Sequence, residues 1–179
     1  MDIKSFVNIT SRAWALPILS SMHTGTPGRQ AALINATGAS RTAFAQSMDH
    51  LIQSGLLERN PGHGHPLRPE FRLTKLGIAA AEIAAQVQNV SGKDDQILLR
   101  KAWTLPVLTT LNKPNQFGQI KKSLASITDR ALSQSLQTME EKNWVQRQVN
   151  LTARPPRPIY CAINTGAAIS KVTSQAISL

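Results

Sequence analysis

Apolar residues recur at helical spacing in several stretches of the first half of the chain. Residues 9–22 predict a buried helix with Trp14 in the core, and Pro17 would kink this helix because it lacks a backbone N–H donor. Ser40 is a favourable N-cap residue, and the helix that it starts has an apolar face made of Phe44, Met48, Leu51 and Ile52. The other predicted elements are a short lead-in at 1–8, a helix at 29–35, strands at 56–59 and 71–74, and a closing helix at 77–90.

The second half of the chain shows the same pattern in the same order. It predicts helices at 97–111, 117–124 and 128–142, strands at 144–149 and 159–163, and a last helix at 167–177. The letters also repeat, since Arg12-Ala-Trp-Ala-Leu-Pro-Ile-Leu19 returns as Lys101-Ala-Trp-Thr-Leu-Pro-Val-Leu108. Trp103 is therefore expected in a core, like its counterpart. We interpret the chain as two copies of one unit, with domains at 1–90 and 91–179 and a linker at 91–95.

The order of elements in each copy predicts a fold. Helix, short helix, turn, amphipathic helix and two-stranded hairpin are the parts of a winged helix-turn-helix. The expected class is mainly α with small β-hairpin wings (α+β), arranged as tandem duplicated winged helix-turn-helix domains. An α-helix fits the major groove of duplex DNA, where each base pair presents a distinct set of donors and acceptors. The second helix of the turn motif is the one that enters the groove.

The polar faces of the two predicted recognition helices carry arginine and glutamine, which suit guanine and adenine edges. The candidate base-contacting residues are Ser40, Arg41, Thr42, Ala45 and Gln46 in the first copy, and Thr128, Asp129, Arg130, Ser133, Gln134 and Gln137 in the second. The hairpins and the helix at 117–124 carry basic residues suited to phosphate contacts. These candidates are Arg59, His63, His65, Arg68, Arg72, Lys121, Lys122, Arg147, Arg154 and Arg157. Asp129 would repel a phosphate, and we interpret it as favouring the positive end of its helix.

The overall charge supports a polyanionic partner. The chain has 20 Lys and Arg against 10 Asp and Glu, which gives a net charge of +10 and a pI near 10.5. Residues 1–90 hold 8 basic and 5 acidic side chains (+3), and residues 91–179 hold 12 and 5 (+7). Such an excess attracts nucleic acid or an anionic membrane surface, and the recognition-helix pattern favours nucleic acid. Neither a secretory signal nor a membrane-spanning apolar run is visible, so we expect a soluble, cytoplasmic, nucleoid-associated protein without membrane contact.

Several other classes of function lack their usual residues. The single cysteine excludes an intramolecular disulfide and a cysteine-rich zinc site. His63 and His65 could be metal ligands, but without a third ligand nearby we interpret them as part of a basic loop. The sequence contains no glycine-rich phosphate loop and no nucleophile–base pair with the usual spacing. We therefore expect no metal, no cofactor and no enzymatic activity.

Segments in both copies carry a resemblance to a known family. Ala102-Trp-Thr104, Gly55-Leu-Leu57 and Phe71-Arg-Leu-Thr-Lys-Leu-Gly77 occur in a fixed order relative to the helices. In this order they resemble the HxlR-type winged-helix transcriptional regulators, which are relatives of the MarR type. The resemblance implies binding of double-stranded DNA and regulation of transcription. Some members of the family sense oxidants through a cysteine before the first helix, but Cys161 lies in a predicted wing strand, so this property is not expected here.

The duplication raises a question about how the chain binds its target. Members of the family usually have one domain and pair as homodimers, whereas this chain holds two domains. We therefore expect a pseudo-dimer that presents two non-identical recognition helices to an asymmetric site, with a further homodimer or another protein partner also open. The alternative is a non-catalytic adaptor of chromosome-segregation or transcription complexes that binds proteins and has only non-specific affinity for DNA.

Overall fold

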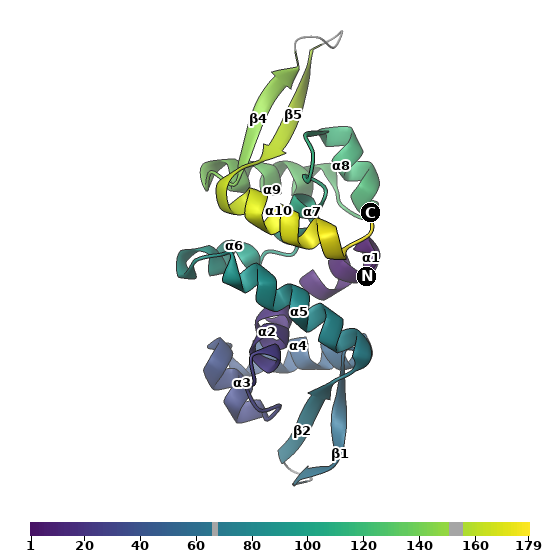
Figure 1. Ribbon diagram of the computed structural model, residues 1–179, viewed down its shortest axis with the longest axis vertical. Coiled ribbons are helices and arrows are strands. Elements are labelled where there is room, and N and C mark those ends of the chain that lie inside the picture. The colour runs from purple at the N-terminus through teal and green to yellow at the C-terminus, as the bar shows by residue number, and fades with distance from the viewer. Residues whose placement is uncertain (66–67, 151–155) are drawn as a thin grey trace. The chain divides into compact units, whose positions relative to one another are not determined.

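The chain folds into two compact units, and each contains one of the two repeats (Figure 1). The computed structural model describes residues 1–65, 68–150 and 156–179, without the side chains of 61–65, 68 and 150. The first domain comprises residues 12–89, and the second comprises residues 1–11 together with 90–179. This grouping differs from the expected division at 1–90 and 91–179 in where the first eleven residues belong.

The first domain is a helical unit with one β-hairpin. Its elements are α2 (Ala15–His23), α3 (Gln30–Thr37), α4 (Arg41–Gln53), β1 (Leu57–His65), β2 (Arg68–Leu73) and α5 (Lys75–Asn89). Helix α2 packs against α3, α4 and α5, and the core between them includes the buried side chains of Leu19, Leu33 and Phe44. Strands β1 and β2 pair in antiparallel fashion from Leu57 opposite Leu73 outward.

The second domain repeats this arrangement with additions. Its elements are α1 (Ile3–Thr10), η1 (Lys93–Asp95), α6 (Gln96–Leu99), α7 (Thr104–Thr109), β3 (Asn115–Gln116), α8 (Phe117–Leu124), α9 (Asp129–Glu141), β4 (Val145–Asn150), β5 (Arg157–Ala162) and α10 (Asn164–Ala176). Helix α7 packs against α10 as α2 packs against α5 in the first domain. Leu105, Leu108 and Leu132 are fully buried in its core. The predicted order of helices and hairpin is thus present in both domains.

The N-terminal segment is a helix, so the expectation of a plain lead-in at 1–8 is wrong. Ser5 N–H donates to Asp2 Oδ1 at 2.7 Å, which caps α1 and lowers the pKa of the Asp2 carboxyl. Ile3 and Phe6 are buried, and α1 contacts α7 and α8. The main chain also pairs with the C-terminus, because Ile3 N–H donates to Ser178 O at 2.9 Å. Both chain ends are therefore held in the second domain, and their labels lie close together in Figure 1.

The two Trp-Leu-Pro segments do not lie inside one long helix. Helix α2 begins at Ala15 and α7 begins at Thr104, so Pro17 and Pro106 each occupy the third position of a helix. The first turn of a helix has N–H groups without helical partners, and a proline there removes no hydrogen bond. The expected helices at 9–22 and 97–111 are therefore each split into two, and neither proline produces a kink. Trp14 and Trp103 precede these helices and are half-buried rather than core residues.

A third, very short strand was not expected from the sequence. In the second domain β3 pairs with β5, with Gln116 opposite Ile159, so the sheet order is β3-β5-β4. In the first domain the equivalent contact is an isolated antiparallel bridge between Arg29 and Glu70. A pairing of one or two residues has no hydrophobic period, so the pattern along the chain does not reveal it.

The same close packing joins the hairpin to the closing helix in both domains. Thr74 N–H donates to Leu56 O at 3.0 Å in the first domain, and Ile163 N–H donates to Trp144 O at 2.8 Å in the second. Gly77 and Gly166 lie one helical turn further on, where a Cβ atom would overlap those same carbonyl oxygens. This close approach is the physical reason why glycine occurs at this position in both repeats.

We expect Gly77→Ala and Gly166→Ala each to lower the free energy of unfolding of their own domain by about 1–3 kcal/mol, because the backbone must move to admit a methyl group. Gly118→Ala is the control. Its methyl group would meet no atom within 4 Å, and alanine in a helix should raise stability by up to about 1 kcal/mol. Urea denaturation followed by circular dichroism measures all three, and equal effects would contradict the packing argument.

Candidate nucleic-acid interface

Helix α4 separates a buried face from an exposed polar face. Ser40 caps it by accepting a hydrogen bond from Ala43 N–H at 3.3 Å, and Phe44, Met48 and Leu51 are buried beneath it. The five candidate base-contacting residues of this domain are all exposed, namely Ser40, Arg41, Thr42, Ala45 and Gln46. The structure therefore places them together on the first turns of the second helix of the turn motif.

Helix α9 has the same construction in the second domain. Thr128 accepts a hydrogen bond from Ala131 N–H at 3.2 Å, and Leu132, Leu136 and Met139 form the buried face. The candidate residues of this helix are also exposed, namely Thr128, Asp129, Arg130, Ser133, Gln134 and Gln137. Gln137 differs from the others because its Nε2 donates to Glu141 Oε1 at 3.1 Å. Its amide is thus engaged within the helix.

The recognition helices end alike but are entered by different turns. The residues that follow them, Gly55 and Asn143, have φ values of +69° and +59°, the left-handed conformation common after a helix. Before α4, the left-handed residue is Gly38 at φ +71°. Before α9 it is Ala125 at φ +46°, and Ser126 N–H donates across it to Leu124 O at 2.5 Å. This tight three-residue turn is strained for an alanine.

Two lysines on α8 were candidates for phosphate contacts, and they differ in surroundings. Lys121 Nζ lies 2.7 Å from Asp129 Oδ1, so the first residue of the recognition helix pairs with the preceding helix. Lys122 is exposed to solvent. The Lys121–Asp129 pair is itself exposed, and such pairs contribute at most about 1 kcal/mol in water. A DNA phosphate can therefore compete with Asp129 for Lys121. The Asp129 carboxylate then remains beside the phosphate and repels it.

The wing candidates fall into three groups. Arg59, Arg147 and Arg157 are exposed on the hairpins, whereas Arg72 Nε donates to Glu58 Oε1 at 2.7 Å. The side chains of His63, His65 and Arg68 and the whole of Arg154 lie outside the described residues. Sequence reasoning missed Arg29, which precedes α3 and lies 3.4 Å from Glu70 Oε1 through its Nε. Arg29 lies beside the wing because of its isolated β-bridge to Glu70. A bridge of one residue pair produces no recognisable pattern in the sequence.

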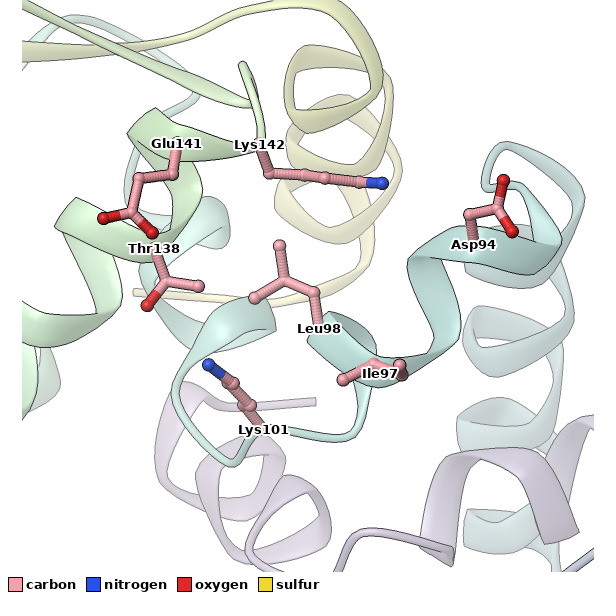
Figure 2. Close-up of a pocket in the computed structure, with 7 residues that line it drawn as sticks. All are labelled: Asp94, Ile97, Leu98, Lys101, Thr138, Glu141 and Lys142. Carbon is pink, nitrogen blue, oxygen red and sulfur yellow. The ribbon is translucent and has the colours of Figure 1, made fainter.

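A pocket of about 300 Å³ opens at the other end of α9 (Figure 2). Ile97, Leu98 and Lys101 line it from the α6 side, and Thr138 and Glu141 line it from α9. It lies roughly 14–18 Å along the helix from Asp129, given a rise of about 1.5 Å per residue. The pocket therefore takes no part in the exposed face near the N-terminus of α9.

The described part of the chain offers no group of three or more metal-ligating side chains close enough to hold an ion. Cys161 is a free, half-buried thiol in β5. Among the described helices, none is both long and apolar enough to cross a membrane.

Comparison with known protein families matches the chain twice to the family described as HxlR-like helix-turn-helix, at residues 9–94 and 98–178. The chain belongs to the HxlR-like family. Two matches in tandem confirm both the predicted fold class and the duplication. HxlR-like proteins are DNA-binding regulators of transcription rather than enzymes, so duplex DNA is the partner of this chain. Neither the curated proteins nor the solved structures include a match to it.

We expect Asp129→Asn to raise the affinity of this HxlR-like protein for duplex DNA, because Lys121 loses its carboxylate partner and a negative charge leaves the recognition helix. If Lys121 gains one phosphate contact, the plot of the logarithm of the association constant against the logarithm of the salt concentration should become steeper by about 0.9. Asp94→Asn changes the net charge equally at an exposed site in η1 and is the control. Fluorescence anisotropy at several salt concentrations measures both, and an unchanged or lower affinity for Asp129→Asn would contradict the expectation.

Proposed function

We propose that the chain is a sequence-specific regulator that binds a two-part site in duplex DNA as a pseudo-dimer. The observation that carries the proposal is the presence of two capped helices, α4 and α9, each with an exposed polar face on its first turns. One chain thus supplies the two recognition helices that a homodimer of single-domain relatives would supply. No second copy is needed to complete the site.

The exposed polar faces of α4 and α9 have one candidate base-contacting residue in common and differ at another. Gln46 and Gln134 occupy the same place in the repeat, and glutamine pairs with the N6 and N7 edge of adenine. The first helical residue is Arg41 in α4 but Asp129 in α9. Arginine selects guanine, whereas the Asp129 carboxylate is paired with Lys121 Nζ. We therefore expect half-sites that agree at the adenine and differ at the base beside it.

The wings complete the proposed contacts. Arg59, Arg147 and Arg157 are exposed cations on hairpins, and such hairpins reach the sugar–phosphate backbone or the minor groove beside the major-groove helix. These contacts would position the helices without reading sequence. Helix-turn-helix pairs read half-sites about one helical turn apart, so we expect a spacing of roughly 10 bp.

Arg41→Ala and Arg130→Ala test the use of both helices. Each should weaken binding to the selected duplex by about 1–3 kcal/mol and relax base preference in one half-site only, with a different half-site for each variant. Gln53→Ala, at the exposed C-terminal end of α4, should change neither quantity. Selection from a random duplex pool with each variant gives the preferences.

The result that would contradict the pseudo-dimer is a loss of specificity with Arg41→Ala alone, while Arg130→Ala behaves as wild type. Binding without any preferred sequence would instead favour the adaptor function, in which the recognition faces serve a protein partner and the charge gives only general attraction to DNA.

A further inference from the structure

The first domain is joined to the second domain at two places along the chain. The chain leaves the second domain after Ser11 and returns to it at Val90. A body attached at one point can turn about that point in every direction, whereas a body attached at two points can turn only about the line that joins them. How firmly each connection is held therefore limits the orientations that are open to the first domain.

The first of these connections is held by apolar packing. Helix α1 ends at Thr10, and its residues Ile3, Phe6 and Ile9 are buried. The contacts of α1 with α7 and α8 attach it to the second domain. Residues 11–14 alone separate α1 from the start of α2. This connection is therefore both short and firmly held at its beginning.

The second connection is held by one carboxylate. Asp95 Oδ2 accepts a hydrogen bond from Gly92 N–H at 2.7 Å, and Asp95 N–H donates to Gly92 O at 3.2 Å. Asp95 Oδ1 lies 3.2 Å from Nζ of Lys142, which is the C-cap residue of α9. Figure 2 shows the Lys142 side chain extending from the end of α9 toward the segment that carries Asp94. The two oxygens of Asp95 thus join the linker to the end of the second recognition helix.

Burial distinguishes this ion pair from the exposed pairs of the chain. The side chain of Asp95 is 12% exposed, whereas that of Asp129, the partner of Lys121, is 68% exposed. Water screens a buried charge less than an exposed one, so the attraction between Asp95 and Lys142 is the stronger of the two. Loss of the Lys142 ammonium group would leave a buried carboxylate without its cation, which is unfavourable.

The pair does not belong to the framework that the two repeats have in common. When the repeats are aligned, Phe6 corresponds to Asp95 and Ser54 corresponds to Lys142. Neither Phe6 nor Ser54 carries a charge, so the first repeat cannot form this ion pair. The pair therefore occurs only in the repeat that receives the chain as it returns from the first domain.

We propose that Asp95 is a positioning residue, which holds the linker on the end of α9 and thereby sets the spacing of half-sites that α4 and α9 can bind together. The inference rests on the proposed binding of a two-part site, and Asp95 itself needs no contact with DNA. Moving a half-site by one base pair rotates it by about 35° around the duplex, so the orientation of the first domain decides which spacing fits.

The length of free linker gives the size of the effect. With Asp95 in place, residues 90–91 are free and span at most about 7 Å. Without it, the next buried side chain is that of Leu98, and residues 90–97 span up to about 28 Å. The effective concentration of one helix at its half-site falls roughly as the −3/2 power of linker length, so a fourfold longer linker lowers it by up to about eightfold.

A series of duplexes tests the inference in the full-length chain. Each holds the two selected half-sites at a spacing changed by one base pair at a time, and one further duplex holds only the half-site that α9 selects. Asp95→Ala removes both contacts of the carboxylate, Lys142→Met removes the ion pair alone, and Lys142→Arg keeps a cation at that position. Lys113→Met, at an exposed lysine of the same domain, is the charge-matched control for Lys142→Met.

We expect Asp95→Ala to lower the affinity for the preferred spacing by up to about eightfold relative to the other spacings. Lys142→Met should flatten the spacing preference in the same way but less, while Lys142→Arg and Lys113→Met should keep that of the wild type. The ratio of affinities at two spacings does not depend on net charge, and fluorescence anisotropy measures it. Lys142 is 40% exposed, so Lys142→Met still provides the test if circular dichroism shows that Asp95→Ala does not fold.

An unchanged spacing preference in folded Asp95→Ala and in Lys142→Met would overturn the inference while leaving two-part binding intact. So would an equal loss of affinity for the duplex with one half-site, because Asp95 would then act on α9 itself. A wild-type chain that shows no preferred spacing, or that binds one half-site only, would overturn the proposed function and this inference together.

Discussion

The arrangement of each domain depends on one close contact between backbones. A carbonyl oxygen at the start of the hairpin, from Leu56 or Trp144, accepts a hydrogen bond from the residue that opens the closing helix. Gly77 or Gly166 lies where any side chain would strike that oxygen. Because the recognition helix ends just before the hairpin, the contact ties recognition helix, wing and closing helix together. The base of the wing is held in this way, which fixes the hairpin relative to the recognition helix.

Duplication has preserved this framework while the surfaces have diverged. The helix caps, the left-handed residues after the recognition helices and the buried glycines are matched between domains. Several charged positions are not matched. When the two repeats are aligned, Arg41 corresponds to Asp129. The charged pair Glu58–Arg72 of the first hairpin corresponds to the neutral pair Gln146–Cys161 of the second. A homodimer presents the same surface twice, whereas two domains in one chain can carry different charges at equivalent positions.

The sequence predicts the repeat, the winged fold and the exposed face of both recognition helices, because long amphipathic helices with N-cap residues have a strong period. It does not reveal features that depend on contacts distant along the chain. The helix at 3–10 belongs to the second domain through its pairing with Ser178. Pro17 looks like a kink until the start of α2 at Ala15 is known. The pairs Lys121–Asp129 and Arg29–Glu70 join residues whose distance only the fold determines.

In the proposed mode of binding, one chain occupies both halves of its DNA site. The most direct measurement is the number of chains bound to a selected duplex, by native mass spectrometry, together with a hydroxyl-radical footprint of the same complex. We expect one chain per duplex and two protected segments whose centres lie roughly 10 bp apart. Two chains per duplex, or one protected segment for one bound chain, would contradict it.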